Sequence, residues 1–320
     1  MLMNHRRVRY VSGLRGRMPL ITVALVSALV LNACSAAAAD VPFVDLTNRE
    51  PVPAAAPTDS DPLRMAVAAV LSPEGNIDNY AGLARYLGDH LGRPVELVQR
   101  RTYAEVNDLV ADGAVDLAFV CTSAYVAGSE RGEMELLVVP EVGAERVYYS
   151  SVIVPSDSTA TTFADLEGTA FAFTDPMSNT GRVYPTYLVK QLGDIPESFF
   201  ASVFFTYSHD KAIEAVADGV ADGAAVDSLV LDYALARDPS LGSRIRVIHR
   251  SPPFGMPPVV VPTVSAPELR DELQQALLEL QQSSAGRAIL DQIGVDRFVI
   301  GNDEDYESVR SLVAATGLEP

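Results

Sequence analysis

The sequence is poor in basic residues and in clustered metal ligands. Only two lysines occur in the 320 residues, Lys190 and Lys211, and the formal net charge is −18 at pH 7. Proteins that bind nucleic acid neutralise its phosphates with basic patches. No such patch or run is present, so nucleic-acid binding is excluded. The histidines are too scattered for a zinc cluster, and we expect neither a metal nor a cofactor.

Common catalytic signatures are also missing. The chain contains no G-x-S-x-G, no H-E-x-x-H and no P-loop. We therefore expect no enzymatic activity. The alternative is an enzyme that uses Cys121 as nucleophile and His209 as base, and rapid alkylation of Cys121 that a ligand prevents would favour it.

The N-terminus has the pattern of a secretory signal. Five arginines and no acidic residue precede an apolar run, Leu20–Leu31, which is short for a membrane span. The run ends at Leu31-Asn32-Ala33-Cys34, which resembles the bacterial lipobox. We expect residues 1–33 to be a lipoprotein signal peptide and Cys34 to be lipidated, which anchors the protein to a membrane surface. The alternative is a signal-anchor helix with an incidental cysteine.

Removal of residues 1–33 leaves 19 basic and 42 acidic residues, a formal net charge of −23. Cys121 is then the sole free thiol, so no disulfide can form within the chain. Residues 34–62 are rich in Ala, Pro, Asp and Thr and predict a flexible tether.

From Leu63 onward, apolar strand patterns alternate with amphipathic helix patterns. This alternation predicts an α/β protein whose sheets are mostly parallel and flanked by helices. The cycle restarts after VYYSSVIVPSDS, which predicts two lobes. We assign 63–146 to the first part of lobe 1, 147–252 to lobe 2, and 253–320 to the crossover and the C-terminal part of lobe 1.

Two crossings between lobes, the second through the Pro-rich SPPFGMPPVVV, predict a hinged clamshell. After this second crossing, Ser265 and Glu268 have the spacing of a capping box, which predicts a helix that ends near Gln282.

One helix–turn–strand unit occurs twice. VADGAVDLAFVC at 110–121 and VADGVADGAAVD at 216–227 share seven identities at a spacing of 106 residues. The strand of one copy ends on Cys121 and that of the other on Asp227. Because open α/β sheets bind ligands at the carboxyl ends of their strands, we expect both residues to face the gap between the lobes.

The loop TDPMSNTGR at 174–182 joins a predicted strand to a predicted helix. Backbone N–H groups at a helix N-terminus, beside Ser and Thr hydroxyls, form an anion site. The alternative is that Ser178 or Asn179 is a plain helix cap.

The segment LEGTAFAFTDPMSNTGRVYP resembles the signature of the phosphate, phosphite and phosphonate substrate-binding proteins of ABC transporters. RTYAEVNDLVADGAVDLAFVCTSAYV, YYSSVIVPSDS, YSHDKAIEAVADGVADGAAVDSLVLD and SPPFGMPPVVV agree with it in the family's order, from about Leu63 to Ala288. The resemblance implies a type II periplasmic-binding-protein clamshell that closes on a small oxyanion.

The resemblance also implies a set of ligand-binding residues. Ser178, Asn179, Thr180 and Gly181 would grip the oxyanion. Further donors would be Tyr103, Tyr149 and His209, with Thr122 and Ser123 lining the other lobe. Tyr148 is an alternative to Tyr149. Core or hinge packing is the alternative for each tyrosine, and a surface helix cap is the alternative for His209.

The sequence departs from the family pattern in two places. The crossing reads Gly255-Met256-Pro257-Pro258, without the acid that meets the amine of aminoalkyl phosphonates. Cys121 stands where a small residue is common, so arsenite stays open as a ligand, as does a buried structural role for the thiol.

Asp227 beside an oxyanion requires a shared proton, because two negative charges at contact repel strongly. Such a pairing suits monoprotonated phosphate or phosphite, or neutral arsenous acid. The alternative is that Asp227 caps the helix that begins at Ser228.

The resemblance implies a lipid-anchored, monomeric, extracytoplasmic binding protein that delivers a phosphate, phosphite or phosphonate to an ABC permease. The alternative is a clamshell that presents an oxyanion or arsenite to a sensor histidine kinase.

Overall fold

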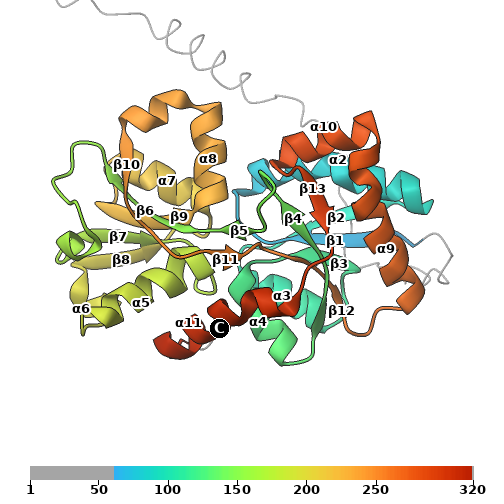
Figure 1. The fold of residues 1–320 in the computed structure, drawn as a ribbon, viewed down its shortest axis with the longest axis horizontal. Helices are drawn as coiled ribbons and strands as arrows, with labels where there is room; N and C mark the ends of the chain where they lie inside the picture. The colour runs from blue at the N-terminus through green and yellow to red at the C-terminus, as the bar shows by residue number, and fades with distance from the viewer. Residues whose placement is uncertain (1–60, 319–320) are drawn as a thin grey trace, which may run out of the picture. The chain divides into compact units, whose positions relative to one another are not determined.

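Two separate β-sheets organise residues 61–318, which are the residues that the computed structural model describes (Figure 1). The predicted signal peptide, Cys34 and residues 35–60 lie outside the described part of the chain. Within residues 61–318, no helix has both the length and the hydropathy that a membrane span requires.

The first sheet has six strands. Their order is β13 (Arg297–Val299), β4 (Met134–Glu141), β12 (Val259–Pro262), β3 (Leu117–Phe119), β1 (Leu63–Val67) and β2 (Val95–Gln99). Strand β1 pairs parallel with both β2 and β3. The pairs of β12 with β3 and β4, and of β13 with β4, are antiparallel.

The second sheet has five strands. Their order is β10 (Ile245–Arg250), β6 (Ser150–Pro155), β9 (Gly223–Asp227), β7 (Ala170–Phe173) and β8 (Ser202–Phe205). Strand β7 pairs parallel with β8 and β9, whereas β6 and β10 join antiparallel. The predicted α/β class is confirmed. Both sheets are mixed rather than mostly parallel. The strands that come before and after each passage of the chain between the sheets pair antiparallel with their neighbours.

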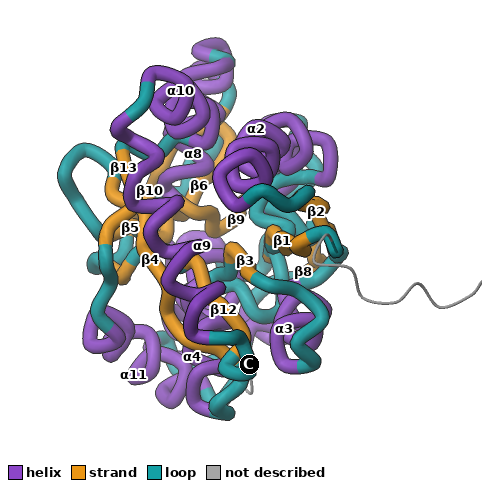
Figure 2. Tube along the Cα trace, turned by 90° about the vertical axis from the view of Figure 1, so that its right-hand side faces the viewer, coloured by secondary structure: helices purple, strands orange, loops and turns teal. Residues whose placement is uncertain are grey.

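Helices cover both faces of each sheet (Figures 1 and 2). On the six-stranded sheet, α2, α9 and α10 share one core, and α3, α4 and α11 share the other. On the five-stranded sheet, α7 and α8 cover one face, and α5 and α6 the other. The helices are α2 (Pro73–Leu91), α3 (Tyr103–Ala111), α4 (Thr122–Glu130), α5 (Tyr184–Gln191), α6 (Pro196–Phe199), α7 (His209–Ala217), α8 (Ser228–Arg237), α9 (Pro267–Glu279), α10 (Ser284–Ile293) and α11 (Glu307–Thr316).

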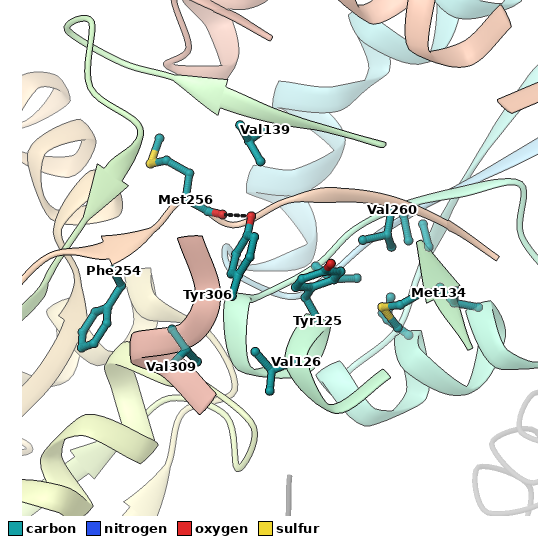
Figure 3. Packing of buried hydrophobic residues seen from close by; sticks show 14 of the residues in the cluster. Tyr125, Val126, Met134, Val139, Phe254, Met256, Val260, Tyr306 and Val309 are labelled. Atoms are coloured by element: carbon teal, nitrogen blue, oxygen red, sulfur yellow. Dashed lines mark hydrogen bonds between the residues drawn. The ribbon is translucent and has the colours of Figure 1, made fainter. Parts of the chain in front are cut away.

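The chain passes between the sheets twice, and the two crossings pair with each other. Short strands β5 (Val147–Tyr148) and β11 (Phe254–Gly255) form an antiparallel pair. Tyr306 donates a hydrogen bond of 2.8 Å to the Met256 carbonyl and so fixes the second crossing (Figure 3). Helix α11 packs against both α4 and α5, next to this pair. The crossings are therefore held in place beside the carboxyl ends of the strands.

The repeat found in the sequence extends far beyond twelve residues. Six elements of the first half have counterparts about 106 positions later. They pair as β1 with β7, the start of α2 with the turn before α5, β2 with β8, α3 with α7, β3 with β9, and α4 with α8. Both α3 and α7 end in an Asp-Gly turn, in which Gly113 and Gly219 have positive φ angles of 60° and 70°. The two halves thus place equivalent strand ends and helix starts at equivalent points.

The predicted capping box at Ser265 is wrong. The N-cap of α9 is Ala266, with no side-chain cap. Pro267 takes the first helical position, and the Ser265 N–H instead donates to the Pro262 carbonyl in a turn after β12. The helix ends at Glu279, and a 3-10 turn, η4 (Leu280–Gln282), extends it to the predicted end.

The Asp-Gly turns give a direct test of the repeat. We expect Gly219→Ala to lower the free energy of unfolding by about 1–2 kcal/mol, because a side chain in the left-handed region is strained even where space is open. Gly113→Ala should cost at least as much, since its new Cβ would lie 3.1 Å from Val264. The measurement is urea denaturation followed by circular dichroism.

Gly82→Ala inside α2 is the matched control, because its Cβ meets only ordinary contacts of 3.4 Å or more. It should leave stability unchanged or raise it by about 0.5–1 kcal/mol. Equal effects of all three substitutions would contradict the assignment of strain to the turns.

Candidate functional site

The turn after β7 is built around Ser178. Its Oγ accepts a 3.0 Å hydrogen bond from the Gly181 N–H. Its carbonyl accepts from the N–H of Val183, five residues later, so that the chain continues as a π-helix, η2 (Asn179–Val183), directly into α5. Such π-turns are frequent at functional sites. Gly181 is required here, because a Cβ would overlap the side chain of Thr174.

This turn is buried and touches the segment that follows β3. The Asn179 N–H points at Cys121 Sγ, 3.4 Å away, and Ser123 Oγ donates to the Met177 carbonyl. Ser178, Asn179 and Thr180 are at most 1% exposed. Cys121 and Ser123, which were predicted to line one side of the site, are therefore in direct contact with the turn that was predicted to form the other side.

Of the adjacent tyrosines, Tyr148 and not Tyr149 belongs to this cluster. Tyr148 is 1% exposed, and its Oη lies 2.6 Å from Thr122 Oγ1 and 3.1 Å from Asn179 Nδ2. Tyr149 instead stacks under the Arg250 guanidinium at 3.7 Å. Successive strand residues point to opposite faces, which explains why only one of the pair can face the turn.

His209 links the turn to the other helix start of the five-stranded sheet. Its Nδ1 accepts a 3.0 Å hydrogen bond from the Asp227 N–H, and its Nε2 lies 3.5 Å from Ser178 Oγ. Burial lowers the pKa of His209 to about 3, against the opposing charge of Asp210. The imidazole is therefore neutral, and because Nδ1 accepts, the proton is on Nε2. His209 is a neutral donor facing Ser178.

Tyr103 occupies the position 106 residues before His209, at the start of α3. It is 1% exposed, and its N–H donates to Asp175 Oδ2 at 3.1 Å. Its Oη is buried with no hydrogen-bond partner among the described residues. Burial raises the pKa of Tyr103 well above 10, and the charges of Cys121, Asp175 and Asp227 add to the effect. The hydroxyl thus stays protonated as a donor.

Asp227 caps α8, as the alternative interpretation held. Its Oδ1 accepts from the Leu229 N–H at 2.7 Å. It is nevertheless 4% exposed and lines a cavity of about 280 Å³. Burial raises its pKa to about 7, although hydrogen bonds from the Leu229 and Val230 backbone oppose the shift. The carboxyl group therefore holds a proton for much of the time near neutral pH.

The cluster as a whole combines donors with acceptors. Tyr103 Oη and His209 Nε2–H donate, whereas Asn179 Oδ1 is a buried acceptor with no partner among the described residues. Unsatisfied buried groups of both kinds are costly. An oxyanion that retains one proton satisfies both kinds at once.

The sequence interpretation missed a second helix start. The N-terminus of α2 is equivalent to that of η2, with Ser72 in the place of Ser178. There, both carboxylate oxygens of Asp210 lie 3.1 Å from the Ser72 N–H. The chain's own carboxylate therefore occupies one of the two equivalent helix starts. The 106-residue spacing, extended back to Ser72, is the signal that pairs them.

No group of three or more His, Cys, Asp or Glu side chains in residues 61–318 has a geometry that could hold an ion. Cys121 is the one thiol there, and burial raises its pKa, although the N–H groups of Asn179 and Ser123 oppose the shift. The thiol is an acceptor within the cluster.

Asp227 gives a pH-dependent prediction. Its pKa is raised, so its contribution to stability is fully present below about pH 4 and is lost as the pH rises through 7. We expect Asp227→Asn, which keeps a capping oxygen, to be more stable than the wild type at pH 8 by on the order of 1–3 kcal/mol. The difference should shrink toward zero near pH 4. Urea denaturation at both pH values measures it.

Asp165→Asn is the matched control, because hydrogen bonds from the Thr161 and Thr162 N–H groups lower the pKa of Asp165 to about 2. This substitution should destabilise the protein at pH 8. If both variants changed stability in the same direction at pH 8, the assignment for Asp227 would be wrong.

The sequence also matches a known protein family. Residues 65–306 match the family described as "ABC transporter, phosphonate, periplasmic substrate-binding protein". The phosphate-import protein PhnD of Mycolicibacterium smegmatis is 27% identical over 261 residues, which cover 75% of this chain and 81% of that protein.

Solved structures share the fold. A binding-protein component of an ABC phosphonate transporter from Pseudomonas aeruginosa has a TM-score of 0.76 at 18% identity, over 81% of this chain and 87% of its own. PhnD1 of Prochlorococcus marinus, solved with methylphosphonate, has a TM-score of 0.73 at 17% identity, over 80% of this chain and 98% of its own.

The predicted type II periplasmic-binding-protein fold is thereby confirmed. Since the family match spans most of the two-sheet region, the chain belongs to the periplasmic phosphonate-binding proteins of ABC transporters, which are extracytoplasmic substrate-binding components and not enzymes.

Proposed function

We propose that this protein captures a small phosphorus oxyanion that retains one proton, in the cluster formed by Tyr103, Tyr148, Ser178–Gly181, His209 and Asp227, and delivers it to the permease of its ABC transporter. The observation that carries the proposal is the Tyr103 hydroxyl, which is buried beside the turn without a partner among the described residues. A buried donor that no protein group satisfies is costly unless a ligand accepts from it.

The comparisons support the class of ligand. The mycobacterial relative is named for phosphate import, and the Prochlorococcus protein was solved with methylphosphonate. Both ligands offer at least three oxygens and a titratable proton. That proton answers Asn179 Oδ1, where a fully ionised oxygen would meet an acceptor and no donor. The carboxyl group of Asp227, whose pKa is raised to about 7, can share one proton with a ligand oxygen.

Binding involves a separation and re-closure of the two sheets at the cluster. The contacts of Asn179 with Cys121, and of Ser123 with Met177, join segments that belong to different sheets. A ligand in the cluster replaces these contacts with stronger charge-assisted hydrogen bonds. Closure around the ligand then marks the loaded state for the permease.

Capture takes place at a membrane surface in this proposal. Lipidation of Cys34 and residues 35–62 as a tether would keep the protein near its permease, and we propose that it acts there as a monomer. Presentation of an oxyanion or of arsenite to a sensor kinase remains the alternative, but the family assignment favours transport.

Tyr103→Phe tests the oxyanion site. We expect affinity for methylphosphonate or phosphate to fall about 10- to 100-fold, because one hydrogen bond to a charged group is lost. Stability should change by less than about 0.5 kcal/mol, since the hydroxyl has no protein partner. Calorimetric titration and thermal unfolding measure the two effects. Tyr149→Phe, outside the cluster, is the control and should change neither.

Thr180→Val adds a second probe of the turn and should abolish oxyanion affinity while the protein still folds. Unchanged affinity in both Tyr103→Phe and Thr180→Val would exclude this site.

Cys34→Ser tests the anchor. We expect the variant to move from the membrane fraction to the soluble fraction of cell extracts, because without lipid nothing in residues 61–318 spans the bilayer. Cys121→Ser is the matched control and should stay in the membrane fraction. Membrane retention of Cys34→Ser would show that another segment anchors the chain.

A further inference from the structure

A largely apolar cavity of about 280 Å³ lies beside the oxyanion cluster. Both sheets contribute to it, through the ends of β1, β3 and β13, the second crossing and the first turns of α8. Its walls include Tyr80, Phe119, Leu229, Val230, Met256 and Phe298. An inorganic oxyanion held at the turn would leave this space unused.

The cavity itself does not suit an anion. No Lys, Arg or His lines it, and its charged groups are Asp227 and Asp232. Asn76 Oδ1 is a buried acceptor in the wall without a partner among the described residues. Tyr233 and Asn79, also in the wall, already hydrogen-bond each other at 3.1 Å. An anionic group would meet apolar surface and acceptors there.

A cation is disfavoured for a different reason. Asp227 is the buried carboxyl group of the cavity, and burial raises its pKa to about 7, which shows that the surroundings disfavour charge. Asp232 is exposed to solvent at the edge, where a charged pair gains little. The cavity therefore favours an uncharged occupant.

Asp227 is the residue that the cavity wall and the oxyanion cluster share. Asp227 lines the cavity, while its N–H donates to His209, whose Nε2 faces Ser178. The imidazole ring of His209 thus lies between Ser178 in the turn and Asp227 in the cavity wall. When the contacts of the turn separate, as in the proposed function, a ligand whose oxyanion sits at the turn would extend its substituent past Asp227 into the cavity.

We propose that the ligand is a phosphonate or a phosphate monoester whose single substituent is an uncharged hydrocarbon group of about four to seven carbon atoms that lies in this cavity. The size follows from the volume, because an apolar cavity of about 150 Å³ already holds benzene. The inference rests on the proposed oxyanion site and adds its substrate class.

Calorimetric titration of the purified protein with five compounds tests the proposal: phosphate, methylphosphonate, butylphosphonate, phenylphosphonate and 2-aminoethylphosphonate. Each buried methylene strengthens binding about fourfold. Butylphosphonate and phenylphosphonate should therefore bind about 10- to 50-fold more tightly than methylphosphonate. Equal or tighter binding of methylphosphonate, or tightest binding of 2-aminoethylphosphonate, would overturn the substrate class but not the oxyanion site. If none of the five bound, the proposed function itself would fail.

Filling the cavity separates its role from that of the turn. Val295 lines the cavity on the six-stranded side, away from His209 and Ser178. We expect Val295→Phe to reduce the preference for butylphosphonate over methylphosphonate at least fivefold, while methylphosphonate affinity stays within about threefold. Val220→Phe, at a site 63% exposed between α7 and β9, is the control and should keep the full preference.

Val230→Phe fills the same cavity from α8 and replaces Val295→Phe if that variant does not fold. A full butyl preference in a folded cavity-filled variant would place the hydrocarbon group elsewhere and overturn the proposal.

Discussion

The hydrogen bond from the Asp227 N–H to Nδ1 of His209 determines what the site can bind. It makes Nδ1 an acceptor, so the proton of the neutral ring must be on Nε2, which faces Ser178. A ring with the opposite tautomer would present a lone pair to the turn and repel an oxyanion. Because the donor is a backbone group at the end of β9, the strand itself fixes this choice. The chemistry of the turn after β7 is thus decided by a residue of the neighbouring strand.

The duplication explains why the site is on one side only. Each half brings two residues to the same place: a buried residue at the start of one helix and the N-cap of the next helix. These are Tyr103 and Cys121 in the first half, and His209 and Asp227 in the second. The halves also present two equivalent helix starts that favour anions. Asp210 fills the one at α2 with a carboxylate of the protein. Of this pair of helix starts in residues 61–318, the one at η2 is left for a ligand, which supports the single oxyanion site that we propose.

Much of this arrangement could be predicted from the sequence. The spacing of 106 identified Cys121 and Asp227 as equivalent strand ends, and the TDPMSNTG loop identified the turn, because local patterns report strand ends and helix caps. The choice between Tyr148, at the end of β5, and Tyr149, which follows it, depends on which side of this extended segment faces the turn, and a two-residue strand is too short for a periodicity that would reveal it. The mixed pairing of the sheets was missed because it depends on the direction in which the chain enters a sheet at each crossing. The cap at Ala266 was missed because it depends on the turn after β12. The cavity beside Asp227 is formed by segments far apart in the sequence, and no local pattern predicts it.

The acidity of the protein is compatible with an anionic ligand because the site works with neutral groups. Whole-chain repulsion from a formal charge of −18 acts over long distances, and salt screens it beyond about 8 Å. The groups that would contact the oxyanion are hydroxyls, backbone N–H groups and a neutral imidazole, and burial keeps a proton on Asp227 for much of the time near neutral pH. None of them needs a counter-charge of its own. Such a site would recognise where the ligand carries its proton more than how much charge it carries, because Asn179 Oδ1 accepts only from a protonated oxygen and Asp227 can share one proton with a ligand oxygen.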